Sequence, residues 1–214
     1  MPELHLDLSE YATRQSILDQ VNAQLGPQHA AEVAARAAGA GVPDVMHHHP
    51  ADVFATLDAL AVSDAVKFHA KAIYELLTHA EATVHEKPID QVHFHEVGRG
   101  AGIQNVVAIC LALEALAPVR ITATPVQAGS GTLHCAHGEM PCPAPATAVI
   151  LDSGVPTCET RLEGERCTPT SAAIIKHYVQ AFDEPGAART YFQGPVPEQP
   201  HGHGHEHGHG EHHH

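Results

Sequence analysis

Residues 103–126 read IQNVVAICLALEALAPVRITATPV, and this stretch decides the fold class. From Ile103 to Leu116 the chain is strongly apolar over the length of a helix, and Pro118 ends it because proline does not fit a helix interior. Val119 to Val126 then alternates in the manner of a strand. A helix followed directly by a strand indicates an α/β protein.

The flanking sequence predicts further helices and short strands around this unit, all in one compact α/β domain. Thr168 is expected to cap the last helix, with Pro169 at its first position. The predicted order is two helices within 9–38, two within 52–84, a strand over 89–97, a glycine turn over 98–102, the helix and strand already quoted, a strand over 132–135, a helix over 146–151, a strand over 155–159 and a helix from 168 to about 182.

Histidine is the unusual feature of the composition. The chain has 214 residues with 21 His, 11 Lys plus Arg and 25 Asp plus Glu, a formal charge of −14 with His neutral. This acidic balance argues against binding to nucleic acid or to an anionic membrane surface, because both are polyanions. No apolar run approaches a membrane span, the start lacks a basic signal region, and the five cysteines form no disulfide framework, so a cytoplasmic protein is expected.

Eight of the histidines lie in the last fourteen residues, where most alternate with glycine. Residues 201–214 contain no apolar side chain, and residues 185–200 are rich in proline and glycine. We therefore expect a folded domain over 1–184, a linker over 185–200 and a disordered tail over 201–214. A purification tag is the alternative, although a tag is an uninterrupted run. Imidazole binds divalent transition metals, and the expected ligands here are His201, His203, His205, His207 and His209.

A second group, His47-His48-His49, lies in a predicted loop between two helices, just before Pro50. Loops usually lie at the surface. Three adjacent imidazoles can chelate a metal ion, or they can be ordinary surface side chains, and both interpretations stay open.

The sharpest local motif is His93-Phe94-His95-Glu96. On a strand, residues i and i+2 share a face, so His93 and His95 would lie side by side with Glu96 at the strand end. Two imidazoles and a carboxylate suit a borderline transition metal. The alternative is a pair of hydrogen-bonded surface histidines.

A second motif combines nitrogen and sulfur ligands within nine residues, from His134 to Cys142. It contains His134, Cys135 and His137, and such a mixture suits a metal that accepts both donor types. Cysteine beside histidine is also common in protein cores, which is the alternative.

Two segments are candidate anion sites. The helix expected after Thr168 offers free backbone N–H groups and the hydroxyls of Thr168, Thr170 and Ser171. The turn Gly129-Ser130-Gly131 could act in the same way. Gly98-x-Gly-x-Gly102 lacks the Rossmann spacing and a Walker lysine, so it is a weaker candidate. Capping and turn formation explain the same residues without a ligand.

Three blocks of the sequence together match a known family. With the His47–His49 loop, they make residues 44–183 resemble the amino-terminal part of the LarC family, the nickel insertion proteins of nickel-pincer cofactor synthesis. The blocks are His93-Phe-His-Glu-Val-Gly98, Gly129-Ser-Gly-Thr-Leu-His-Cys-Ala-His-Gly-Glu-Met-Pro-Cys-Pro-Ala-Pro-Ala-Thr147 and Cys167-Thr-Pro-Thr-Ser-Ala-Ala-Ile-Ile-Lys-His177.

The resemblance implies a reaction in which Ni(II) enters a pyridinium bis-thiocarboxylate mononucleotide, with formation of Ni–S and Ni–C bonds in a CTP-dependent cyclometallation. It requires nickel ligands, a base for the ring proton and an anion site for the phosphate. The sequence departs from the family pattern at Ala101 and Asn105, where the family usually carries two aspartates. Two family features are not visible, namely a Ser-Gly-Asp-Met segment near the start and the carboxy-terminal CTP-binding domain.

We therefore expect a protein that acquires Ni(II) and inserts or delivers it for nickel-pincer cofactor biosynthesis. Whether the chain is itself a cyclometallase stays open. A nucleotide-binding partner subunit, an acceptor enzyme and a second copy of the chain are the partners that this hypothesis admits. The alternative hypothesis is storage or detoxification of nickel or another transition metal, without cofactor chemistry.

Overall fold

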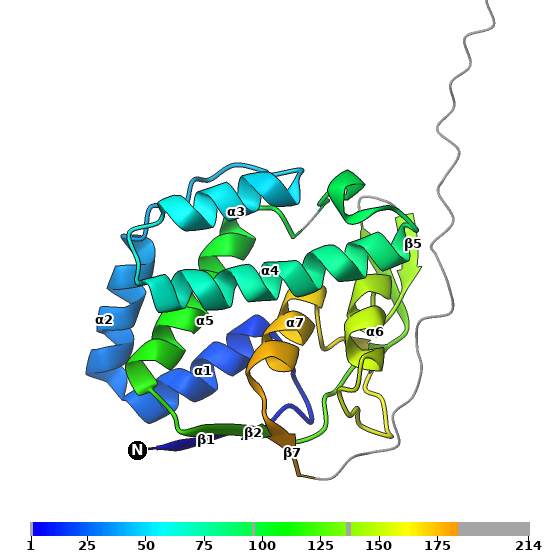
Figure 1. The fold of residues 1–214 in the computed structure, drawn as a ribbon. Coiled ribbons are helices and arrows are strands. Elements are labelled where there is room, and N and C mark those ends of the chain that lie inside the picture. The colour runs from blue at the N-terminus through cyan, green and yellow to red at the C-terminus, as the bar shows by residue number, and fades with distance from the viewer. Residues whose placement is uncertain (1, 96, 136–137, 184–214) are drawn as a thin grey trace, which may run out of the picture.

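The computed structural model describes residues 2–95, 97–135 and 138–183. This part of the chain is compact and combines helices with short strands, which confirms the predicted mixed α/β class. Figure 1 shows the helices stacked above a small sheet. In chain order the elements are β1 (Glu3–Leu6), α1 (Arg14–Leu25), α2 (Pro27–Ala38), α3 (Pro50–Ala59), α4 (Asp64–Val84), the 3₁₀ helix η1 (Ile89–Gln91), α5 (Gly100–Leu116), β2 (Arg120–Ala123), β3 (Gly129–Ser130), β4 (Thr132–Cys135), β5 (Gly138–Pro141), α6 (Pro145–Asp152), β6 (Gly164–Glu165), α7 (Pro169–Tyr178) and β7 (Ala181–Phe182).

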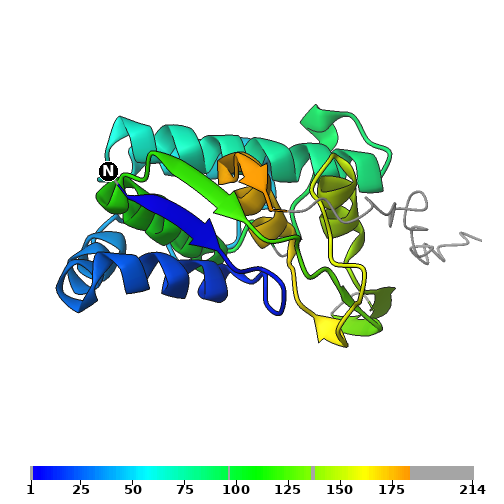
Figure 2. The same ribbon diagram turned by 90° about the horizontal axis from the view of Figure 1, so that it is seen from below.

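The main sheet is parallel, with strand order β1-β2-β7. Leu4 of β1 pairs with Ile121 of β2, and both side chains are buried. Figure 2 shows this sheet lying across one face of the helices. β3 pairs with β6, and β4 pairs with β5, as two separate antiparallel ribbons.

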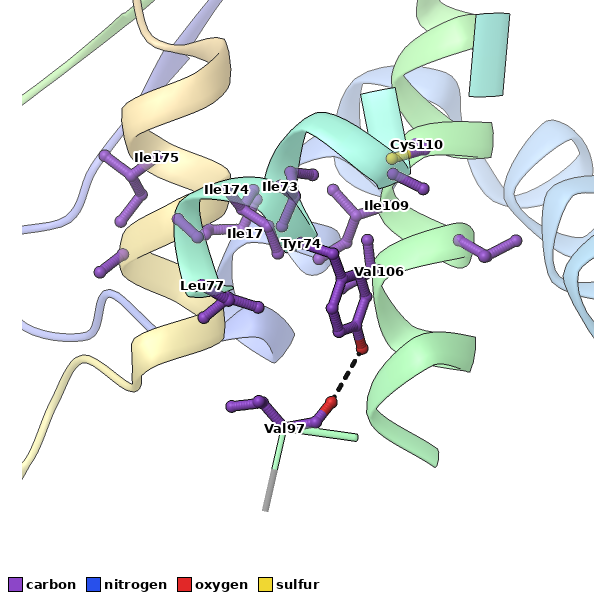
Figure 3. Close-up of a cluster of buried hydrophobic side chains, with 14 of the residues drawn as sticks. Ile17, Ile73, Tyr74, Leu77, Val97, Val106, Ile109, Cys110, Ile174 and Ile175 are labelled. Carbon is purple, nitrogen blue, oxygen red and sulfur yellow. Dashed lines mark hydrogen bonds between the residues drawn. The ribbon is translucent and has the colours of Figure 1, made fainter. Parts of the chain in front are cut away.

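Helix α4 is the centre of the fold and contacts α3, α5, α6 and α7. It begins after Ser63, whose hydroxyl accepts a hydrogen bond from the Val66 N–H at 3.2 Å and so caps the helix. Its apolar face is buried in the core shown in Figure 3. In the same core, the Tyr74 hydroxyl donates to the Val97 carbonyl at 3.0 Å. This bond fixes the segment before α5 to the middle of α4.

The helices predicted within 9–38 and 52–84 are confirmed as α1 to α4. Thr168 caps α7 as expected, since its hydroxyl accepts from the Ser171 N–H at 3.2 Å and Pro169 is the first helical residue. The strand over 132–135 is confirmed as β4.

The strand predicted over residues 89–97 is wrong. Residues 89–91 form η1, and the following residues are extended without a ladder. The burial does alternate, because Val92 and Phe94 are buried while His93 and His95 are exposed. The backbone facing this segment is the loop before α3, and it provides separate contacts such as the Phe94 N–H to the His48 carbonyl at 2.7 Å. Burial on one face therefore produced the period of a strand without strand pairing.

The glycine turn predicted over 98–102 is also wrong, because α5 already starts at Gly100. The glycines permit close packing here. A Cβ at Gly98 would overlap the His47 carbonyl oxygen, and one at Gly100 would overlap the Pro43 carbonyl oxygen. The loop before α3 can therefore lie directly against the start of α5.

Other differences concern short elements. Residues 155–159 contribute one isolated bridge, Val126 to Thr157, in place of the predicted strand. The last helix ends at Tyr178 and is followed by β7, and β1 was not predicted because it has only four residues. Within the described ranges, none of the helices is both long and apolar enough to cross a membrane.

Candidate functional site

A cavity of about 550 Å³ lies where helices α5, α6 and α7 begin. Its volume falls within the range of small-molecule sites. The end of α4 and the β4–β5 ribbon complete its wall. We call this space the helix-start cavity, and its lining includes Ala101, Gly102 and Asn105 from α5, Pro145 and Ala146 from α6, and Pro169 and Thr170 from α7.

The helix starts give the cavity an environment suited to anions. The first turn of a helix has backbone N–H groups without intrahelical acceptors and carries the positive end of the helix dipole. Arg14 of α1 and Arg99, which precedes α5, add two guanidinium groups to the same wall. Three helix starts and two cations thus line one space, which is a favourable environment for a phosphate. Some first-turn N–H groups are already used, since that of Gly100 donates to the Val45 carbonyl and that of Ser171 to the Thr168 hydroxyl.

Glu165 of β6 places a carboxyl group in the lining. Burial raises the pKa of this group above the usual range, and the positive charge of Arg14 opposes part of that rise. A carboxylate with a raised pKa is a better proton acceptor than an exposed one.

Three imidazoles line the cavity, from His85, His95 and His134. The His85 Nε2 lies 3.4 Å from a carboxylate oxygen of Glu81, and the ring centres of His85 and His95 are 5.7 Å apart. On β4, His134 Nδ1 is 3.4 Å from a carboxylate oxygen of Glu139. Across residues 2–95, 97–135 and 138–183, no three His, Cys, Asp or Glu side chains are grouped closely enough to bind one ion.

The two histidines of the 93–96 motif have different neighbours. His93 lies against His49, with ring centres 4.5 Å apart, whereas His95 lies against His85. The structure thus brings together two motifs that are 44 positions apart in the sequence. In the same loop, His47 Nε2 is 3.2 Å from the Thr56 hydroxyl, and His48 is exposed.

The two predicted anion sites are placed differently. Thr168 and Thr170 line the cavity, while Ser171 is buried and its hydroxyl accepts from the Thr168 N–H at 2.8 Å. The Gly129–Gly131 turn is absent from the described residues of the lining. Gly129 and Ser130 form β3, and the Ser130 hydroxyl donates to the Leu162 carbonyl at 3.0 Å.

The positions that depart from the family pattern, Ala101 and Asn105, both face the cavity from the first turns of α5. They are four residues apart and therefore lie on one side of the helix. The cavity wall thus has a methyl group and an uncharged amide at the two positions where the resemblance implies carboxylates.

Several predicted ligands lie outside the described residues. These are Glu96, His137, His201, His203, His205, His207 and His209, together with the 185–200 linker. Cys135 is described only through its backbone, which ends β4.

Sequence reasoning missed five charged or titratable residues of the cavity. One local signal was available, since Glu81 and His85 are four residues apart on a predicted helix and so share a face. Arg99 directly precedes α5, whereas Arg14 and Glu165 reach the cavity through contacts between distant segments. The residues missed were Arg14, Glu81, His85, Arg99 and Glu165.

The chain is similar to known proteins that are named for nickel insertion. The family model described as "Nickel insertion protein" matches residues 4–194. Three proteins named "Pyridinium-3,5-bisthiocarboxylic acid mononucleotide nickel insertion protein" are similar to the chain. The one from Staphylococcus epidermidis is 39% identical over 136 residues, which cover 64% of this chain and 34% of the relative. The one from Lactiplantibacillus plantarum is 38% identical over 149 residues, covering 69% and 33%.

The third relative, from Geobacillus kaustophilus, is 40% identical over 136 residues, covering 64% of this chain and 33% of its own length. The chain thus spans about a third of the length of these relatives. No solved structure matches the chain.

Proposed function

The chain belongs to the nickel insertion protein family, and from this we propose that its helix-start cavity binds Ni(II) and a pyridinium bisthiocarboxylic acid mononucleotide for nickel insertion. The observation that carries the proposal is the convergence of three helix starts, two arginines and three histidines on one cavity of about 550 Å³. Both the nucleotide and the nickel are substrates of the site.

The anionic groups of the nucleotide fit the α5, α6 and α7 starts. Thr170 and the neighbouring backbone would hold the phosphate, with Arg14 and Arg99 balancing the remaining negative charge. Arginine suits this role because its guanidinium group forms paired hydrogen bonds to carboxylate and phosphate oxygens.

The nickel ion would be held by His85 and His95, whose ring centres are 5.7 Å apart, and His134 of the same lining is a further candidate ligand. In the described residues no three such side chains are close enough to bind one ion, so a third ligand requires a side-chain movement. Imidazole nitrogen is a good donor to Ni(II), and the neighbouring Glu81 and Glu139 carboxylates orient His85 and His134. We include Glu96, Cys135 and His137 as candidate ligands on the strength of the sequence motif alone.

Insertion of nickel into the ring breaks a C–H bond and forms a Ni–C bond, so a proton must leave. The Glu165 carboxylate is the acceptor that we propose, because it lies in the cavity and burial raises its pKa. Arg14 beside it would hold the substrate while the proton is transferred.

The test is binding of the thiocarboxylated nucleotide and Ni(II) to the full chain, measured by calorimetry and native mass spectrometry. Arg14→Ala should weaken nucleotide binding roughly tenfold, because it removes one charge-assisted contact. Arg36→Ala is the matched control, since Arg36 forms its ion pair with Glu114 at 3.0 Å and is absent from the lining. Equal nucleotide affinity in the two variants would contradict the proposal.

The storage hypothesis predicts a different outcome. If nickel binding is lost on deletion of residues 201–214 and the nucleotide does not bind, the tail accounts for the function and the cavity does not. A CTP-binding partner subunit, a homo-oligomer and a cytoplasmic location stay predictions.

A further inference from the structure

We propose that His49 and His93 form a second nickel site at the surface, outside the helix-start cavity. The identity of the metal rests on the proposed function, whereas the site itself rests on the geometry of two segments that meet only in the fold. His49 directly precedes α3, and His93 lies between η1 and α5.

The spacing of the two rings fits a shared ion. An imidazole nitrogen binds a first-row divalent metal at about 2.1 Å, so two rings at neighbouring positions on one ion have centres about 4.6 Å apart. The ring centres of His49 and His93 are 4.5 Å apart, with the planes tilted by 56°. Both residues are exposed, so an ion can reach them from solvent.

The backbone around the pair is fixed, which holds the two rings in register. The Phe94 N–H donates to the His48 carbonyl at 2.7 Å, and the His47 N–H donates to the Gly98 carbonyl at 2.9 Å. The Phe94 side chain, next to His93 in the chain, is fully buried and anchors this segment to the core. A ligand pair on such a support loses little conformational freedom when it binds an ion.

The surface pair and the cavity pair are neighbours along one short segment. His93 belongs to the first and His95 to the second, so a single residue separates the two positions. Each pair supplies only two imidazoles, which leaves most nickel coordination positions to water or to other ligands. Two protein ligands give moderate affinity and allow exchange, which suits an ion on its way to another site and not one in storage.

The test uses the full chain and nickel chloride alone at pH 7.5. Residues 201–214 are also expected to bind metal, so a bulk titration would not resolve the pair. A short pulse of diethyl pyrocarbonate labels accessible neutral imidazoles, and peptide mass spectrometry reads each histidine separately. Nickel should protect His49 and His93 over the same concentration range.

The deciding variant is His93→Gln. In this variant, the nickel concentration that gives half-maximal protection of His49 should rise at least fivefold. The concentration that gives half-maximal protection of His85 should change less than twofold. His49→Gln, read at His93, is the reciprocal variant, and exposed His29→Gln on α2 is the control. A shift below fivefold at both positions would mean that the rings are in simple contact, and it would overturn the site.

The same data distinguish failure of the proposed function from failure of the surface site. If nickel and the nucleotide leave His85, His95 and His134 unprotected, the cavity assignment fails, while the response of His49 to His93→Gln still decides the surface pair.

Discussion

Two histidine pairs, one in the first half of helix α4 and one just past its end, differ in what surrounds them. In the first half of the helix, His69 Nδ1 lies 2.8 Å from His177 Nε2 of α7, and the Tyr178 ring lies against both imidazoles. Just past the other end, His85 lies beside the Glu81 carboxylate and against the His95 ring, and both histidines line the helix-start cavity. The first pair is used in packing between helices, whereas the second lines a space that can hold a ligand.

The difference shows that a histidine count does not locate a function. Burial lowers the pKa of His69 and of His177, which favours two neutral rings that share one hydrogen bond. Two of the cavity histidines, His85 and His134, have carboxylate neighbours instead, which orient an imidazole for metal binding. The interhelix pair His69–His177 should therefore affect stability, and the cavity histidines should affect binding.

The largest effect is expected from removal of two cavity ligands. The double variant His95→Gln/His134→Gln should weaken nickel binding in the cavity about 100-fold, at roughly tenfold for each ligand lost. The nickel concentration that protects His85 from modification by diethyl pyrocarbonate measures this affinity. His69→Gln should leave that protection within twofold, and an equal loss in both variants would remove the distinction between the two pairs.

A smaller effect, in the opposite direction, is expected from restoring carboxylates on α5. Ala101→Asp/Asn105→Asp should tighten divalent metal binding in the cavity about tenfold, because two oxygen donors join the imidazoles on one wall. Aspartate near a helix start is also compatible with the helix dipole. The same labelling assay measures the change, and Ala61→Asp, in the exposed connection between α3 and α4, is the control. Unchanged protection in the α5 variant would show that these positions do not reach the ion.

The interhelix pair should contribute to stability. His177→Phe keeps a ring against Tyr178 but removes the hydrogen bond to His69, so the free energy of unfolding should fall by about 1 kcal/mol. Urea denaturation, monitored by circular dichroism, measures this free energy. His85→Gln should change the free energy of unfolding by less than about 0.5 kcal/mol. A larger loss in His85→Gln than in His177→Phe would reverse the assignment.

The smallest effect is expected for the pH dependence of the stability that the His69–His177 pair contributes. Both pKa values are lowered in the folded protein, mainly by burial, although the Glu114 carboxylate opposes part of the shift at His69. The unfolded chain therefore binds more protons as pH falls through about 6.5, and stability is lost in that direction. The melting temperature should drop less between pH 7.5 and 5.5 in His69→Phe/His177→Phe than in the wild type. An identical drop would exclude the pair as the cause.

The helices could be predicted because their signals are local. Ser63 and Thr168 cap helices through hydroxyl groups three residues before the N–H that they accept from, and Pro169 marks the first turn. The strand predicted over residues 89–97 was wrong for a physical reason. Alternating burial of Val92 and Phe94 needs only one covered face, while a strand also needs a continuous backbone partner.

The candidate site was predictable only in its parts. His95, His134 and Thr168 were found from motifs, but nothing in their spacing showed that they line one cavity. The pairing of His93 with His49 depends on glycines, since a side chain at Gly98 would push the loop away from α5. Arg14 lies more than eighty residues from the start of α5, so no local pattern connects the two.

The convergence of three helix starts has a consequence for how this cavity could change over time or in the laboratory. In the proposed function, part of the attraction for anions comes from helix dipoles and main-chain N–H groups, which every residue except proline carries. If the proposed function holds, exchanging Ala101, Asn105 or Ala146 should alter shape and metal affinity while the main-chain contribution stays in place. The side chains of the lining could then be substituted one position at a time, by evolution or by design, to accept other phosphorylated molecules.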